Sequence, residues 1–188
     1  ASLTFMFAMG LSVTAMIRIG NQKGLNDYVT LRKVAISIFL LTIIIEVVFA
    51  LLFVALHTTL PYIFIDINDA ENLTKNLEVI AISANLLLVA AVFQISDGLQ
   101  VVVLGALRGL QDAKIPMYIT FVAYWVIGFP ISIYLGLETE LKAVGVWIGL
   151  LAGLTAAALF LYIRFNYLTK KLVQVQTNPE ASGQVQLQ

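Results

Sequence analysis

Residues 79–106 read VIAISANLLLVAAVFQISDGLQVVVLGA, and this stretch decides the fold of the chain. As a helix rising about 1.5 Å per residue, it is long enough to cross the ~30 Å hydrocarbon core of a bilayer. Its single ionisable residue is Asp97. A charged group inside a membrane span costs roughly 2.5–3.5 kcal/mol on insertion scales. We therefore expect Asp97 to face a partner, a cavity or a transported ion.

The composition is typical of a membrane protein. Hydrophobic residues make up 60% of the chain and charged residues 12%, about half of what a soluble domain carries. The formal net charge is zero, so no overall field favours binding to nucleic acid. The chain has no cysteine, which excludes disulfides, zinc–thiolate sites and cysteine nucleophiles, and His57 is its single histidine.

Five apolar segments predict an all-α integral membrane protein. They lie at about residues 1–19, 35–58, 79–106, 115–136 and 143–163. Continuous apolar runs of this length are not barrel strands, so only helices can cross the membrane here. We expect a helical bundle over residues 1–171 and a disordered cytoplasmic tail over the polar, glutamine-rich residues 172–188. Ala1 opens the chain directly on apolar residues, which indicates the C-terminal part of a longer protein.

The basic residues predict the orientation. If the five spans alternate, Lys75 and Lys142 fall on one side of the membrane and nine basic residues on the other. The nine are Arg18, Lys23, Arg32, Lys33, Arg108, Lys114, Arg164, Lys170 and Lys171. The positive-inside rule places these nine, and the C-terminus, in the cytoplasm.

Polar residues of the third span fall on one stripe at 100° per residue. Ser83, Gln94 and Asp97 share this stripe, and Gln100 lies at its edge. Gln94 and Gln100 stand three residues before and after the carboxylate, within side-chain reach. The stripe indicates the wall of a water-filled cavity. The alternative is an interhelical hydrogen-bond network around a protonated Asp97.

Glu46 is a second acid within a span, with Thr42 and Ala50 one turn to either side on its face. We expect it to hydrogen-bond to Thr42 or another helix, or to line the same cavity as Asp97. Glycines recur every four residues at Gly145, Gly149 and Gly153, a spacing that predicts close helix packing. Pro130 predicts a kink in the fourth span.

Familiar enzyme chemistry is absent from the sequence. It has no G-x-x-x-x-G-K-[ST], H-E-x-x-H or G-x-S-x-G motif, and no second aspartate on a neighbouring span that would form a protease dyad with Asp97. Neither an enzyme nor a resident cofactor is therefore expected. Filter-like repeats and rings of charge, which a channel requires, are also missing.

Three stretches resemble the multidrug and toxic compound extrusion (MATE) transporters. Residues 3–21 (LTFMFAMGLSVTAMIRIGN) resemble the opening of the eighth helix, although Ala8 stands where a proline is common. Residues 93–117 (FQISDGLQVVVLGALRGLQDAKIPM) resemble the tenth helix and the turn into the eleventh. Residues 124–130 (YWVIGFP) look like the eleventh helix itself.

The resemblance implies a twelve-helix antiporter of two six-helix lobes, of which this chain forms helices eight to twelve, most of the C-terminal lobe. Such a protein lies in the bacterial cytoplasmic (inner) membrane and exports cationic drugs in exchange for Na⁺ or H⁺ by alternating access. Its N-terminal lobe is then a partner from the same chain. Asp97 matches the acid of the tenth helix that NorM-type members use for cation coupling, whereas the usual acidic partner lies on the seventh helix.

Two other functions remain open. A lipid-linked saccharide flippase of the same superfamily shape tends to line its cavity with several Arg and Lys, and no basic residue lies mid-span here. A non-transporting scaffold bundle would use Asp97 for packing alone. The predicted transport cavity consists of Ser83, Glu46, Gln94, Asp97 and Gln100.

Overall fold

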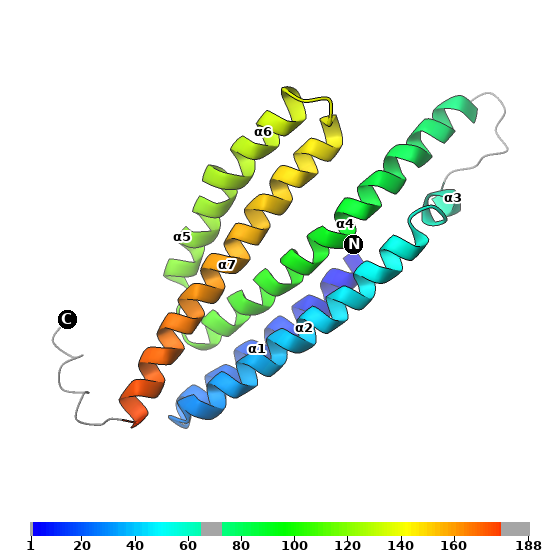
Figure 1. The fold of residues 1–188 in the computed structure, drawn as a ribbon. Coiled ribbons are helices and arrows are strands. Elements are labelled where there is room, and N and C mark those ends of the chain that lie inside the picture. Colours follow the sequence, from blue (N-terminus) through cyan, green and yellow to red (C-terminus); the bar gives the residue numbers. More distant parts are fainter. Residues whose placement is uncertain (1, 65–72, 178–188) are drawn as a thin grey trace.

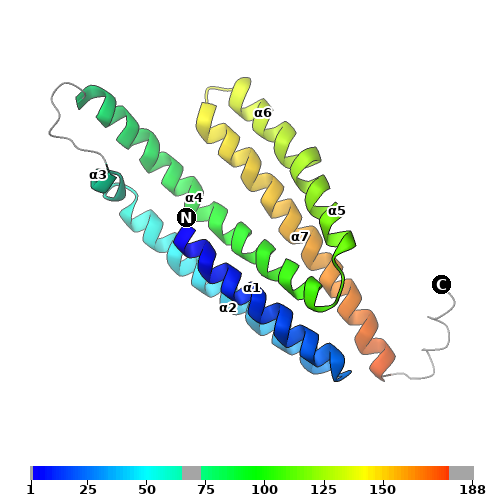
Figure 2. The same ribbon diagram turned by 180° about the vertical axis from the view of Figure 1, so that it is seen from behind.

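The computed structural model describes residues 2–64 and 73–177, and long helices make up most of them (Figures 1 and 2). The helices are α1 (Ser2–Gly24), α2 (Tyr28–Leu56), α3 (Leu60–Phe64), α4 (Leu73–Gly109), α5 (Lys114–Val122), the π-helical turn η1 (Ala123–Gly128), α6 (Phe129–Leu137) and α7 (Lys142–Thr177). Because α5, η1 and α6 follow one another without a break, they form one rod.

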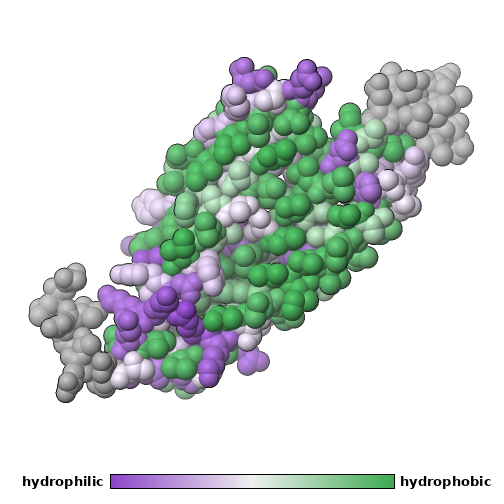
Figure 3. All heavy atoms as spheres, in the orientation of Figure 1, coloured by the Kyte–Doolittle hydropathy of each residue, from purple (hydrophilic) through white to green (hydrophobic). Residues whose placement is uncertain are grey.

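The predicted all-α membrane fold is confirmed. Within the described residues, four helices are long and apolar enough to cross a membrane: Tyr28–Leu56, Val79–Gly109, Lys114–Leu137 and Lys142–Thr177. The shorter α1 is not among these four. On the face shown in Figure 3, hydrophobic side chains form a broad belt, and hydrophilic ones gather toward the two ends.

The helices extend beyond the apolar segments that predicted them, because polar residues at helix ends continue the backbone hydrogen bonds. The largest difference is in α7, which ends at Thr177 rather than near residue 163. The predicted disordered tail is therefore helical over residues 172–177. There the side chain of Gln176 accepts a hydrogen bond of 2.9 Å from the Tyr28 N–H at the start of α2. Residues 178–188 lie outside the described part of the chain.

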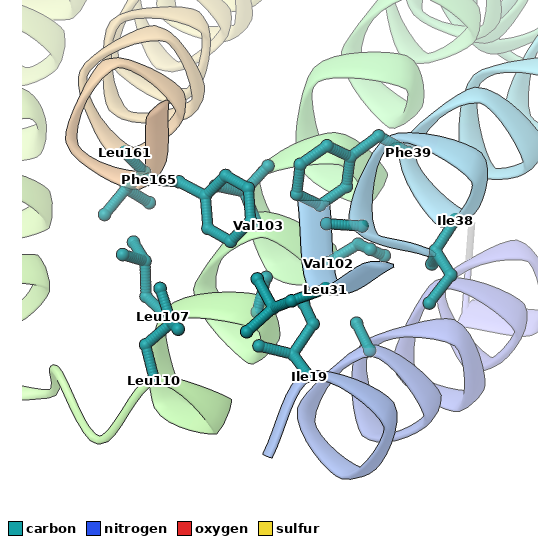
Figure 4. Close-up of a cluster of buried hydrophobic side chains, with 13 residues drawn as sticks. Ile19, Leu31, Ile38, Phe39, Val102, Val103, Leu107, Leu110, Leu161 and Phe165 are labelled. Atoms are coloured by element: carbon teal, nitrogen blue, oxygen red, sulfur yellow. The ribbon is translucent and has the colours of Figure 1, made fainter. Parts of the chain in front are cut away.

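Helix α4 lies at the centre of the bundle. It packs against α1, α2 and α7, and the α5–η1–α6 rod lies along α7 (Figures 1 and 2). Buried apolar side chains join the four packed helices in one core (Figure 4). Phe39 of α2 meets Phe165 of α7 edge to face, with ring centroids 5.3 Å apart. These contacts fix how α2, α4 and α7 lie around the site described below.

Small residues bring helix backbones together at two places. On α7, Gly145 faces Leu135 and Gly149 faces Ser132, so α6 and α7 touch backbone to backbone as the glycine spacing predicts. A Cβ built at Gly153 would lie 2.9 Å from the Cα of Gly128. On α4, Gly105 lies against Ser12 of α1, whose hydroxyl donates a 2.8 Å hydrogen bond to the Val101 carbonyl.

The kink predicted at Pro130 takes the form of the π-helical turn η1. Phe129 N–H bonds to the carbonyl of Tyr124, five residues earlier, instead of to the carbonyl four residues earlier. Proline cannot donate a backbone hydrogen bond, and its ring clashes with the carbonyl four positions back in a regular α-helix. A wider turn directly before Pro130 relieves that clash.

One end of the bundle carries most of the basic helix ends, namely the C-terminal ends of α1, α4 and α7 and the N-terminal ends of α2 and α5 (Figure 1). Lys23 Nζ donates to the Leu110 carbonyl at 2.8 Å and to Gln111 Oε1 at 3.1 Å. Arg164 Nε pairs with Asp112 Oδ2 at 2.9 Å. These bonds tie α1 and α7 to the turn after α4. The cytoplasmic location of this end stays a prediction.

A matched pair of alanine substitutions tests the close contact of the α7 glycines with α6. In Gly149→Ala, the new Cβ overlaps the backbone of Ser132, so α6 must move away from α7. We expect a loss of about 1–3 kcal/mol, the usual cost of overpacking. In Gly10→Ala, the Cβ meets nothing within 4 Å, so stability should be unchanged or slightly higher. Thermal unfolding of the complete natural protein in detergent measures the stability of both variants. Equal midpoints would contradict the close backbone contact between α6 and α7 at Gly149.

Candidate functional site

A cavity of about 70 Å³ lies between α1, α2, α4 and α7. Its polar lining residues are Thr4, Glu46, Gln94 and Asp97. The other lining residues are apolar or glycine: Phe5, Ala8, Ala90, Phe93, Gly98 and Trp147. The space is large enough for a small ion with water, whereas a drug-sized ligand needs about 300–1,000 Å³.

Asp97 reaches this cavity from the C-terminal half of α4 and is half-buried. Among the described residues, none donates a hydrogen bond to its carboxylate. The alternative expectation was an interhelical hydrogen-bond network around Asp97. The described residues contain no hydrogen bond that would form such a network. Ser96 faces the other way and bonds to Thr155 of α7 at 3.0 Å. The turn that carries Asp97 is thus held by its neighbours, while the carboxylate faces the cavity.

Glu46 enters the same cavity from α2 and is only 2% exposed. Its Oε2 is buried and has no hydrogen-bond partner among the described residues. Thr42, the partner considered from the sequence, instead donates to the Ile38 carbonyl of its own helix at 2.8 Å. Gly98 provides the space for Glu46, because a Cβ there would lie 2.8 Å from both Cγ and Oε1 of the glutamate.

Gln94 connects the two helices beside the acids. Its Nε2 donates to the backbone carbonyl of Glu46 at 3.4 Å, and the side chain is 6% exposed. This bond orients the amide, so that Oε1 is left buried without a hydrogen-bond partner in the described residues. Gln94 thus adds an unsatisfied acceptor to a cavity that already contains two carboxyl groups.

The other two predicted cavity residues lie elsewhere. Gln100 is 5% exposed and accepts a 2.7 Å hydrogen bond from Tyr124 Oη, which joins α4 to η1. Ser83 is half-buried nearer the start of α4 and does not line the cavity. The structure therefore brings Glu46, Gln94 and Asp97 together, but not Ser83 or Gln100.

The sequence analysis did not identify the residues of α1 and α7 that line the cavity. Thr4 and Trp147 line the cavity, yet neither stands out from its apolar surroundings in the sequence. Trp147 packs edge to face on Phe93 with ring centroids 5.3 Å apart, which joins α7 to α4 at the cavity wall. None of the lining residues is basic. The arrangement can bind a proton or a small cation between acidic oxygens, within an otherwise apolar wall.

Comparisons with known proteins identify the family of the chain. The sequence model of the MatE family matches residues 1–134. A probable multidrug resistance protein NorM from Rhodopseudomonas palustris is 38% identical over 170 residues, which cover 90% of this chain and 35% of that protein. A protein of the same description from Deinococcus radiodurans is 37% identical over 166 residues, 88% of this chain and 36% of that one.

A solved structure supports the fold. The crystal structure of the eukaryotic MATE transporter AtDTX14 aligns with a TM-score of 0.76 and 20% identity, over 91% of this chain and 37% of that one. The chain thus spans about a third of the length of the relatives it matches. Its five long rods correspond to part of a MATE transporter fold. With a family match over most of its length, the chain belongs to the MatE family.

Proposed function

We propose that the protein containing this chain is a secondary active antiporter that exports organic cations in exchange for Na⁺ or H⁺, with Asp97 as its coupling carboxylate. One observation carries the proposal: Asp97 lies well inside an apolar helix and faces a small cavity with a second acid and no basic lining residue. The names of the relatives support the substrate class, since they are described as probable multidrug resistance proteins.

The chemistry of Asp97 suits ion coupling. An ionised carboxylate in a membrane span is costly, and a bound proton or Na⁺ removes most of that cost. Ion binding therefore favours whichever conformation presents the carboxylate to the ion, as any ligand favours the state that binds it better. Each charge that moves down the membrane potential releases about 2.3 kcal/mol per 100 mV. This energy can reset the transporter after it has released its drug.

The organic cation binds outside this cavity, because about 70 Å³ is too small for a drug. We propose that the remaining two thirds of the protein, an N-terminal lobe and the seventh helix, complete the substrate path. The membrane is the bacterial cytoplasmic one, with the basic end of the bundle and the C-terminus inside. A saccharide flippase is less well supported, because the described cavity offers no basic side chain to a pyrophosphate.

The complete natural protein should export cationic dyes. We expect energised cells that express it to accumulate less ethidium than cells with an empty vector, and to lose this difference when the ion gradient is collapsed. Fluorescence of intracellular ethidium measures both. Equal accumulation across several cationic dyes would contradict the proposed substrate class.

Asp97→Asn should abolish ion-driven efflux while expression stays near normal, because it preserves the shape of the side chain and removes the ionisable group. The matched control is Asp27→Asn, the same chemical change at the N-cap of α2. There the Thr30 N–H donates to Asp27 Oδ1 at 3.0 Å, and Asn is an equally good N-cap. The control should transport as wild type does. Normal efflux in Asp97→Asn would exclude Asp97 as the coupling group.

A further inference from the structure

Coupling through Asp97 alone leaves Glu46 unexplained, since a buried acid without a hydrogen-bond partner is costly to retain. We propose that Glu46 is a second ion-binding residue, and that Glu46, Asp97 and the side-chain oxygen of Gln94 bind one Na⁺ ion between α2 and α4, in competition with protons. The inference rests on the proposed function of Asp97 and adds to it the identity of the ion and a second carboxylate.

The first argument is the position of the two acids. Glu46 and Asp97 come from different helices, α2 and α4, and line the same cavity. Glu46 is 2% exposed, so little of its side chain reaches bulk water, and its buried Oε2 has no partner among the described residues. Two carboxyl groups that share a small apolar cavity repel each other when both are ionised. A cation between them removes this repulsion and satisfies both.

The second argument concerns Gln94, which distinguishes Na⁺ from a proton. Its Oε1 is buried without a partner, and an amide oxygen does not take up a proton near neutral pH. A proton on one carboxyl group can satisfy a single neighbouring acceptor. A hard cation such as Na⁺ accepts several oxygen ligands at once, of both carboxylate and amide type. Two carboxyl groups and an unpaired amide oxygen in one cavity therefore favour Na⁺.

The third argument is that the site has dedicated space. Gly98 follows Asp97 directly and lies against the Glu46 side chain, where a Cβ would come within 2.8–2.9 Å of its Cγ, Cδ and Oε1. The absence of a side chain at residue 98 thus lets the Glu46 carboxyl group approach the turn that carries Asp97. Among the cavity residues contributed by α1, α2, α4 and α7, the titratable side chains are Glu46 and Asp97.

Carbodiimide labelling of the purified complete protein tests the proposal without any substitution. Dicyclohexylcarbodiimide modifies protonated carboxyl groups in apolar surroundings, and mass spectrometry locates the label. We expect both Glu46 and Asp97 to be labelled in choline buffer, and Na⁺ to slow both reactions with the same midpoint concentration. Protection of Asp97 without protection of Glu46 would overturn the second-carboxylate assignment and leave the coupling role of Asp97 intact.

Other outcomes separate this inference from the proposed function. If Na⁺ protects neither residue, the Na⁺ site is wrong, whereas ion-driven dye efflux that depends on Asp97 would still stand with protons as the coupling ion. If dye efflux is absent but Na⁺ protects both residues, the ion site holds and the export of organic cations fails.

Substitutions on α2 provide the matched comparison. Glu46→Gln keeps the volume but removes the charge, and it should raise the Na⁺ concentration that protects Asp97 by roughly tenfold or more, that is, by at least ~1.4 kcal/mol. Thr42→Val lies one turn away on the same buried face and removes a hydroxyl group that bonds only within its own helix, so the midpoint should not change. An unchanged midpoint in Glu46→Gln would overturn the proposal.

Discussion

Close contact between helix backbones is the constraint on which this bundle depends. Lipid tails are as apolar as leucine, so helices in a membrane gain little from hiding apolar side chains and associate through packing instead. Glycines allow that packing on both sides of the molecule. Gly105 of α4 lies against Ser12 of α1, and Gly149 of α7 lies against Ser132 of α6. The core of Figure 4 then joins α1, α2, α4 and α7.

The same principle creates the site. Because Gly98 has no side chain, the carboxyl group of Glu46 from α2 lies close to it. At Gly105 and Gly149, by contrast, the neighbour is the backbone of another helix. An acid is thereby held beside Asp97 with its Oε2 unsatisfied in the described residues. The same small residue that permits close packing therefore leaves room for a buried acid, and a charge on that acid would be costly in such apolar surroundings.

Periodicity predicted the part of the structure that one helix determines by itself. The long helices, the cavity-facing positions of Gln94 and Asp97 and the close approach at Gly149 all follow from spacing along one segment. Relations between helices could not be obtained this way. Gln100 lies on the same face as Asp97 but bonds to Tyr124, because η1 packs beside it. Glu46 was recognised as a buried acid, yet only the packing of α2 on α4 shows what it faces. The helical course of residues 172–177 was missed because composition does not show the contact of Gln176 with α2.

The π-helical turn before Pro130 has a consequence for how this rod could have arisen and how it can change. A π turn contains one residue more than the α-helical turn it replaces, so it is equivalent to a single-residue insertion within a regular helix. Removing one of residues 125–128 would restore the ordinary pitch and rotate α5 by about 100° relative to α6. The α6 side, held by Ser132 against α7, would keep its place, while Tyr124 would swing away from Gln100. The side chains of α5 and α6 therefore follow different rotations about the helix axis. A single residue, encoded by one codon, determines the angle between them.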